Sequence, residues 1–142
     1  MILISHRGNI SGPVPEQENN PDYILKALEC GYNVEVDVWY KDNKWYTGHD
    51  APQYNVGKLF LQNNNIWCHA KNVDALYSML CTDIIHFWHE NDAATLTSNG
   101  YIWTYPGKQL TPLSIAVLPE LTEAVVESAA GICSDFIERY KA

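Results

Sequence analysis

The chain has 142 residues, of which 46% are hydrophobic and 18% charged, and this is the composition of a globular protein rather than of a disordered one. Its length predicts a single domain over residues 1–142 that can bury a core without disulfides or structural metal ions. The formal net charge of −8, with no cluster of Lys or Arg, argues against nucleic acids and anionic membranes as partners.

Eight short segments, apolar or alternating between apolar and polar residues, predict strands. They cover residues 2–5, 33–40, 44–48, 66–70, 83–88, 101–105, 114–118 and 131–136. Residues 20–31 carry the clearest helical pattern, with Asn20 as N-cap, Pro21 at the first helical position and Gly31 as the stop. Two further helices are expected over residues 72–81 and 122–131.

Alternating strands and helices favour parallel strands joined by crossover connections, and eight strands favour closure into a barrel. A complete barrel of this kind usually needs about 250 residues. We therefore expect an α/β fold, a compact, trimmed TIM-type (β/α)8 barrel with several helices reduced to loops. Asp135, in the last predicted strand, is expected to hydrogen-bond the backbone where the barrel closes.

The four cysteines are irregularly spaced and form no Cys-x-x-Cys pair, so we expect free thiols rather than a zinc site or a redox motif. The N-terminus has no signal-peptide pattern, and no run of about 18 apolar residues predicts a membrane span. These features predict a cytoplasmic protein with no stable membrane insertion.

Two carboxylates share one face of the predicted strand over residues 33–40, where Glu35 and Asp37 alternate with valines. On an interior face these like charges would repel each other unless a cation lay between them, and Mg²⁺ and Ca²⁺ prefer oxygen ligands. One interpretation is therefore a divalent metal site. The other is the solvent-facing polar side of an edge strand.

Further polar side chains lie near the C-terminal ends of predicted strands. The first strand leads into His6 and Arg7, the third into His49, and the fourth carries His69 and Lys71 on one face. Taken singly, each could be a solvated strand end or a hydrogen-bonded core histidine. In parallel barrels, however, the active site lies at the C-terminal ends of the strands.

Together these residues would suit a substrate that carries an anionic phosphate. Arg7 can bind a phosphate through two parallel hydrogen bonds, with Lys71 as a second candidate. A metal ion at Glu35 and Asp37 can neutralise charge on the phosphate, and two histidines can exchange protons with the nucleophile and the leaving group.

Other histidines and aromatic residues are weaker candidates. His86 and His89 have opposite parity on a strand, so only one can face the interior, and His89 is the candidate because it lies nearer the C-terminal end. Trp88, Trp103 and Tyr105 are expected to pack in the core or at its rim rather than to form a stacking platform.

Four motifs resemble the glycerophosphodiester phosphodiesterase family, part of the phosphatidylinositol phospholipase C-like superfamily. They are "ISHRGN" at 4–9, "PEQENNPDYILKAL" at 15–28, "GYNVEVDVWY" at 31–40 and "GHD" at 48–50, in the family's order and spacing. "IWTYPG" at 102–107 and "AGICSDFI" at 130–137 are similar to its later strands.

The resemblance implies acid–base catalysis by His6 and His49, phosphate binding by Arg7 with Glu18 close to the site, and metal binding by Glu35 and Asp37. Where the family has Glu-x-Lys on its fourth strand, this chain has His69-Ala70-Lys71, so His69 becomes the candidate third metal ligand. The chain also lacks the family's substrate-capping insertion, which implies a more open site.

Two other functions remain open. The same site could bind phosphorylated glycans or lipid headgroups without turnover, or Glu35 and Asp37 alone could serve carbohydrate hydrolysis. Within the phosphodiesterase interpretation, either water or a hydroxyl next to the phosphate could attack.

Overall fold

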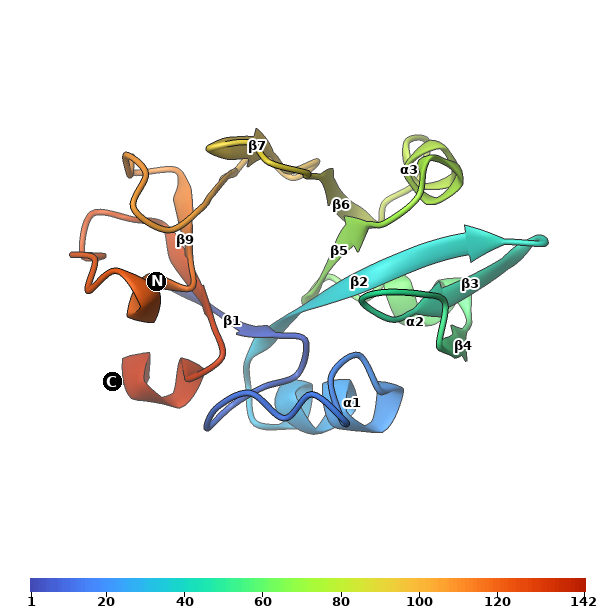
Figure 1. Ribbon diagram of the computed structural model, residues 1–142, viewed down its shortest axis with the longest axis horizontal. Coiled ribbons are helices and arrows are strands. Elements are labelled where there is room, and N and C mark those ends of the chain that lie inside the picture. Colours follow the sequence, from blue (N-terminus) through green and yellow to red (C-terminus); the bar gives the residue numbers. More distant parts are fainter.

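Ten strands form one mixed sheet in the computed structural model, which describes residues 1–142. Seven of them run parallel, in the spatial order β6-β5-β2-β1-β10-β9-β8. Their bounds are β1 (Ile2–His6), β2 (Asn33–Lys41), β5 (Ile66–Ala70), β6 (Ile85–Trp88), β8 (Ile102–Thr104), β9 (Ser114–Val117) and β10 (Gly131–Ser134). Figure 1 shows the strands arranged around a common centre, with α1 (Pro21–Glu29) and α3 (Val73–Met79) outside them.

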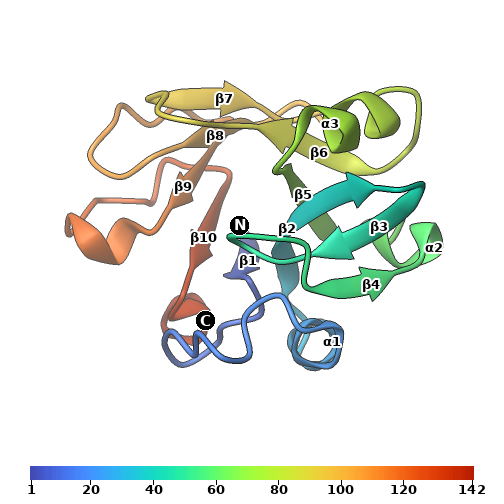
Figure 2. The same cartoon turned by 45° about the vertical axis from the view of Figure 1, so that its right-hand side comes forward.

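Three further strands pair in antiparallel fashion: β3 (Lys44–Thr47) with β2, β4 (Tyr54–Val56) with β3, and β7 (Ala94–Leu96) with β8. The turn between β2 and β3 consists of Asp42 and Asn43, whose φ angles of 52° and 59° are those of a tight two-residue hairpin. This hairpin and β4 lie to one side of the parallel strands (Figure 2). Strand β3 runs back along β2 and ends with Thr47 opposite Val38, near the middle of β2.

The predicted TIM-type (β/α)8 barrel is wrong. Only three α-helices are present, α1, α2 (Lys58–Leu61) and α3, together with the 3-10 helices η1 (Pro119–Leu121) and η2 (Ile137–Tyr140). No ladder joins β6 to β7 or β8, so hydrogen-bonded pairing does not close the sheet. The chain is too short for a crossover helix after every strand, and part of its length forms antiparallel strands instead.

Most of the individual elements agree with the prediction. Each of the eight predicted strands overlaps an observed strand, and only the three-residue strands β4 and β7 were missed. Helix α1 begins at Pro21, with the Asn20 side chain accepting a hydrogen bond from the Asp22 amide. The helix predicted over residues 122–131 is wrong, because η1 ends at Leu121 and turns lead from there to β10.

The packing of β2 decides which way its carboxylates point. Its three valines, at positions 34, 36 and 38, are buried against α1, α3 and their neighbours. Because side chains alternate along a strand, Glu35 and Asp37 point to the opposite face, toward the centre of the molecule. A second cluster around Trp67, Phe87 and Trp103 fills part of that interior. None of the helices has the length and apolar character needed to cross a membrane.

Candidate functional site

A cavity of about 470 Å³ opens where the parallel strands β1, β2, β5 and β6 end. The carboxyl ends of parallel strands meet at one edge of a sheet, which is where ligands bind in open α/β sheets. The cavity lining includes eight of the nine candidate site residues: His6, Arg7, Glu35, Asp37, His49, His69, Lys71 and His89. Glu18 is not part of the lining.

His6 is held by the side chain of Asp135. The His6 Nδ1 atom lies 2.7 Å from Asp135 Oδ1, and the same oxygen accepts a hydrogen bond from Asn9 Nδ2 at 2.9 Å. A carboxylate can only accept, so Nδ1 carries the hydrogen and Nε2 faces Glu35 Oε2, 3.7 Å away. The prediction that Asp135 bonds the backbone was therefore wrong. Its role depends on a partner 129 residues away in the chain, which no local pattern reveals.

Two opposing effects act on the pKa of His6. Burial alone would lower this pKa, but the hydrogen bond to Asp135 and the charge of Glu35 outweigh it, so the pKa of His6 is raised. Conversely, burial would raise the pKa of Asp135, yet His6 and Asn9 hold it below its usual value. The hydrogen bond between His6 and Asp135 therefore favours a protonated imidazole beside an ionised carboxylate.

Arg7 has a left-handed backbone conformation, with φ of 57°. This conformation is unfavourable for a residue other than glycine, so contacts with the surrounding structure must stabilise it. Its Nη1 lies 3.1 Å from Glu18 Oε1, its Nε lies 3.1 Å from Asp37 Oδ2, and its Nη2 donates to His49 Nδ1 at 3.0 Å. Glu18 therefore contacts Arg7 rather than the cavity. The guanidinium links three segments of chain at the cavity wall.

His49 reaches the cavity by a route the sequence did not predict. Its strand, β3, is antiparallel to β2, and Gly48 donates its amide to the Asp37 carbonyl at 3.1 Å. Gly48 has φ of 153°, and a Cβ there would lie 2.1 Å from the Ala51 carbonyl oxygen. The hairpin, rather than the carboxyl end of a parallel strand, thus places the His49 ring beside Arg7 and 3.5 Å from Asp37 Oδ2.

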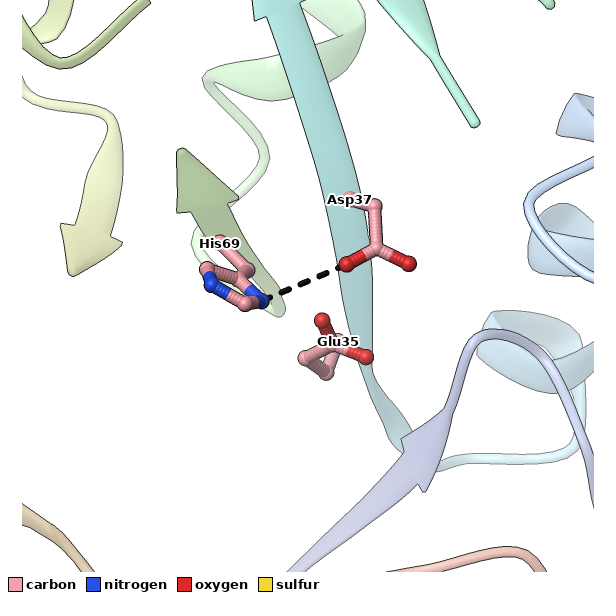
Figure 3. A group of neighbouring side chains, drawn as sticks. All are labelled: Glu35, Asp37 and His69. Atoms are coloured by element: carbon pink, nitrogen blue, oxygen red, sulfur yellow. Dashed lines mark ion pairs between the residues drawn. The ribbon is translucent and has the colours of Figure 1, made fainter. Parts of the chain in front are cut away.

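Glu35, Asp37 and His69 form a cluster whose ligand atoms all lie within 4.8 Å of one another. Figure 3 shows both carboxylates projecting from β2 toward the His69 ring on β5. Both acids are buried, and Glu35 Oε2 and Asp37 Oδ1 have no hydrogen-bond partner. Leaving such a group unpaired costs about 1–3 kcal/mol or more, which a bound cation would offset, so the donor set fits a divalent ion.

The two carboxyl groups have different surroundings. Burial, and then the charge of Asp37, raise the pKa of Glu35. Burial would also raise the pKa of Asp37, but His49, His69 and Arg7 hold it well below its usual value. Asp37 is therefore the acid that stays ionised.

Asn19 fixes the position of Asp37 and was missed by the sequence analysis. Its side chain donates to Asp37 Oδ2 and accepts from the Asp37 amide, both at 2.9 Å. Thr47, on β3, donates its hydroxyl to the Asn19 carbonyl at 2.7 Å. The one available signal was that Asn19 directly follows Glu18 in a segment that carries the family resemblance.

Aromatic rings form another part of the lining, to which Trp88, Trp103 and Tyr105 contribute. The His89 ring stacks on Tyr105 with centroids 3.5 Å apart, and burial, His69 and Lys71 lower the pKa of His89. His86 lies elsewhere, buried, with Nδ1 2.8 Å from the Ile84 carbonyl. Of the two histidines only His89, which directly follows the last residue of β6, lines the cavity.

The chain matches no protein-family model, no curated protein and no solved structure.

Proposed function

We propose that the protein is a short member of the glycerophosphodiester phosphodiesterase family that hydrolyses a small phosphodiester with the help of a divalent metal ion. The observation that carries this proposal is the shared cavity, whose lining includes His6, Arg7, His49 and the Glu35–Asp37–His69 cluster. Acid–base groups, a phosphate ligand and a metal cluster are the three components that metal-assisted phosphodiester hydrolysis requires.

The charged groups of the cavity lining support the proposal that a metal ion binds there. The lining contains two permanent cations, Arg7 and Lys71, against three carboxyl groups, those of Glu35, Asp37 and Glu90. Asp37, the acid that stays ionised, would repel a phosphodiester anion bound beside it unless a cation lay between them. A divalent ion held by Glu35, Asp37 and His69 would neutralise the carboxylates and polarise the phosphate as a Lewis acid. The sequence analysis predicts Mg²⁺ or Ca²⁺ at this position.

The proton transfers fall to His6 and His49. One histidine accepts the proton of the attacking water or hydroxyl as its oxygen bonds to phosphorus. The other donates a proton to the leaving alkoxide as the second phosphorus–oxygen bond breaks. Asp135 fixes His6 with Nε2 turned toward Glu35 and the cavity, while Arg7 contacts the ring of His49. Arg7 and Lys71 orient the phosphate between them.

A binding module without turnover is the second candidate. Arg7 already contacts Glu18, Asp37 and His49, so a phosphate has to compete for the guanidinium. This function predicts metal-dependent binding of phosphodiesters, such as phosphorylated glycans or lipid headgroups, with no hydrolysis. Carbohydrate hydrolysis receives less support, because both carboxylates come from one strand and neither is opposite the other across the cavity.

Hydrolysis of a phosphodiester panel tests the proposal. The panel includes glycerophosphodiesters and an activated aryl diester, each with Mg²⁺, Ca²⁺, Mn²⁺ or Zn²⁺ and with chelator. We expect metal-dependent turnover that His49→Ala lowers by about 10²–10⁴-fold. His86→Gln, which alters a histidine outside the cavity, is the matched control. Binding without turnover for every ion would favour the binding module, and turnover that survives His49→Ala would contradict the proposed roles.

The proposal extends to location and partners. We place the protein in the cytoplasm because all four cysteines are free, with Cys30 and Cys81 exposed, as a reducing compartment permits. Its partner is a small phosphodiester rather than a nucleic acid, given the net charge of −8.

A further inference from the structure

The His69 ring has the orientation of a metal ligand. Its Nε2 atom lies 3.3 Å from the backbone carbonyl oxygen of His89, and a carbonyl can only accept a hydrogen bond. Nε2 therefore carries the hydrogen, which leaves Nδ1 on the opposite side of the ring. Stacking on Phe87, with centroids 5.0 Å apart, restricts rotation of the ring. Metal-binding histidines are typically fixed in this way through the second ring nitrogen.

The free edge of the ring faces two carboxylates. His69 Nδ1 lies 3.3 Å from Asp37 Oδ1, an oxygen that has no hydrogen-bond donor, and Glu35 Oε2 nearby has none either. Figure 3 shows the three side chains converging on the same space. A nitrogen lone pair facing unpaired carboxylate oxygens is unfavourable unless a cation lies between them. That cation is either a metal ion or a second proton on His69.

The nitrogen donor favours one class of ion over another. Mg²⁺ and Ca²⁺ are hard ions whose protein ligands are oxygens, whereas imidazole suits Zn²⁺, Fe²⁺ and similar first-row transition metals. Two carboxylate oxygens with one imidazole nitrogen are a donor set of the second kind.

We infer that the Glu35–Asp37–His69 cluster binds a first-row transition-metal dication, with His69 Nδ1 as a direct ligand, in preference to Mg²⁺ or Ca²⁺. This inference rests on the proposed function, because it names the ion of the same site. The resulting site is a mixed nitrogen and oxygen centre on β2 and β5.

Ion binding to the metal-free full-length protein tests the inference without relying on catalysis. Calorimetric titrations with Co²⁺, Zn²⁺, Mg²⁺ and Ca²⁺ are compared between the wild type, His69→Glu and the control His86→Gln. Many sites bind Co²⁺ or Zn²⁺ more tightly than Mg²⁺, so the decisive quantity is the change in this preference. We expect His69→Glu, an all-oxygen set, to lower the Co²⁺/Mg²⁺ affinity ratio at least about tenfold, and His86→Gln to leave it unchanged.

Electron paramagnetic resonance of the Mn²⁺-loaded wild type gives an independent readout. Hyperfine coupling to a ¹⁴N nucleus is expected from direct ligation by His69, and its absence would overturn the inference even if His69→Glu failed to fold. An unchanged Co²⁺/Mg²⁺ ratio in folded His69→Glu would overturn it as well. If no ion bound at all, the inference would also be overturned, and a proton would be the cation between His69 and the two carboxylates.

Failure of the inference and failure of the proposed function can be told apart. Hydrolysis that proceeds with Mg²⁺ or Ca²⁺, in a protein that shows no nitrogen coupling, contradicts the inference alone. Nitrogen-coupled Mn²⁺ binding together with the expected ratio change, but with no hydrolysis under any ion, supports the inference and contradicts the phosphodiesterase.

Discussion

Asp135 acts on the cavity through His6 rather than by lining it. Its Oδ1 atom receives both His6 Nδ1 and Asn9 Nδ2, and its amide donates to Glu120 Oε1 at 3.1 Å. A carboxylate that is bound by a second side chain and whose backbone is also hydrogen-bonded can fix both the tautomer and the ring orientation of its histidine. Asp135 is therefore a positioning residue in the proposed reaction.

Asp135→Asn should lower kcat on the order of a hundredfold, within the usual contribution of general acid–base catalysis. The carboxylate raises the pKa of His6, so its removal lowers that pKa, and the limb of the pH–rate profile governed by His6 should move to lower pH. A pH profile of kcat/KM measures this shift. Asp83→Asn, an exposed acid bonded to Gln62, is the matched control. An unmoved limb would mean that Asp135 has only a structural role.

Arg7 makes three contacts with a planar, forked group that lysine cannot reproduce. Arg7→Lys should therefore lower kcat/KM by roughly 30-fold, equivalent to about 2 kcal/mol for a hydrogen bond to a charged group. Steady-state kinetics with the best substrate of the panel measure the change. Arg139→Lys, whose guanidinium lies over Phe136, is the control. Equal activity of Arg7→Lys and wild type would remove Arg7 from phosphate binding.

At the scale of elements, locally encoded structure was predictable. Helix α1 was predicted because its cap and its first residue lie next to each other in the sequence, at Asn20 and Pro21. The region after β9 was mispredicted because its structure depends on distant partners. Leu118 has φ of 45°, and the η1 residue Glu120 accepts hydrogen bonds from Ser134 and Asp135. Leu121 is 68% and Val125 78% exposed, so part of the apolar surface that would stabilise a helix in this segment is left in solvent.

The β2–β3 hairpin depends on Gly48, where a Cβ would meet backbone at 2.1 Å. Gly48→Ala should lower the free energy of unfolding by about 1–3 kcal/mol, because alanine fits neither the space nor the φ angle. It should also lower activity by displacing His49. Chemical denaturation and the phosphodiesterase assay measure the two effects. Gly57→Ala, where a Cβ has nothing within 4 Å, is the matched control and should change neither.

At the scale of the whole molecule, the sequence predicted the contents of the site better than the fold around it. His6, Arg7, Glu35, Asp37 and His69 gather because parallel strands bring their carboxyl ends together, and this holds whether or not the sheet closes. Closure itself needs β6 to pair with β7 or β8, the next strands along the chain, and β7 pairs only with β8. No alternation of apolar residues specifies such pairing, so the barrel was predicted wrongly.

Metal binding should stabilise the folded molecule as a whole. The orphaned oxygens of Glu35 and Asp37 lie in its interior, and the unfolded chain has no preformed cluster. An ion present at 100 times its dissociation constant should add about 2.7 kcal/mol, which for a chain of this size raises Tm on the order of 10 °C. Thermal unfolding with the ion and with chelator measures this difference.

Glu35→Gln separates this effect from nonspecific stabilisation by ions. The substitution removes one ligand while keeping the shape of the side chain, so the ion-dependent rise in Tm should largely disappear. Without ion, the variant should be no less stable than wild type, because burial and Asp37 raise the pKa of Glu35 and disfavour its charged form. Glu90→Gln also alters a carboxyl group of the lining but lies outside the cluster, so it should keep the full rise. A rise of the same size in both variants would show that ions bind elsewhere on this acidic protein.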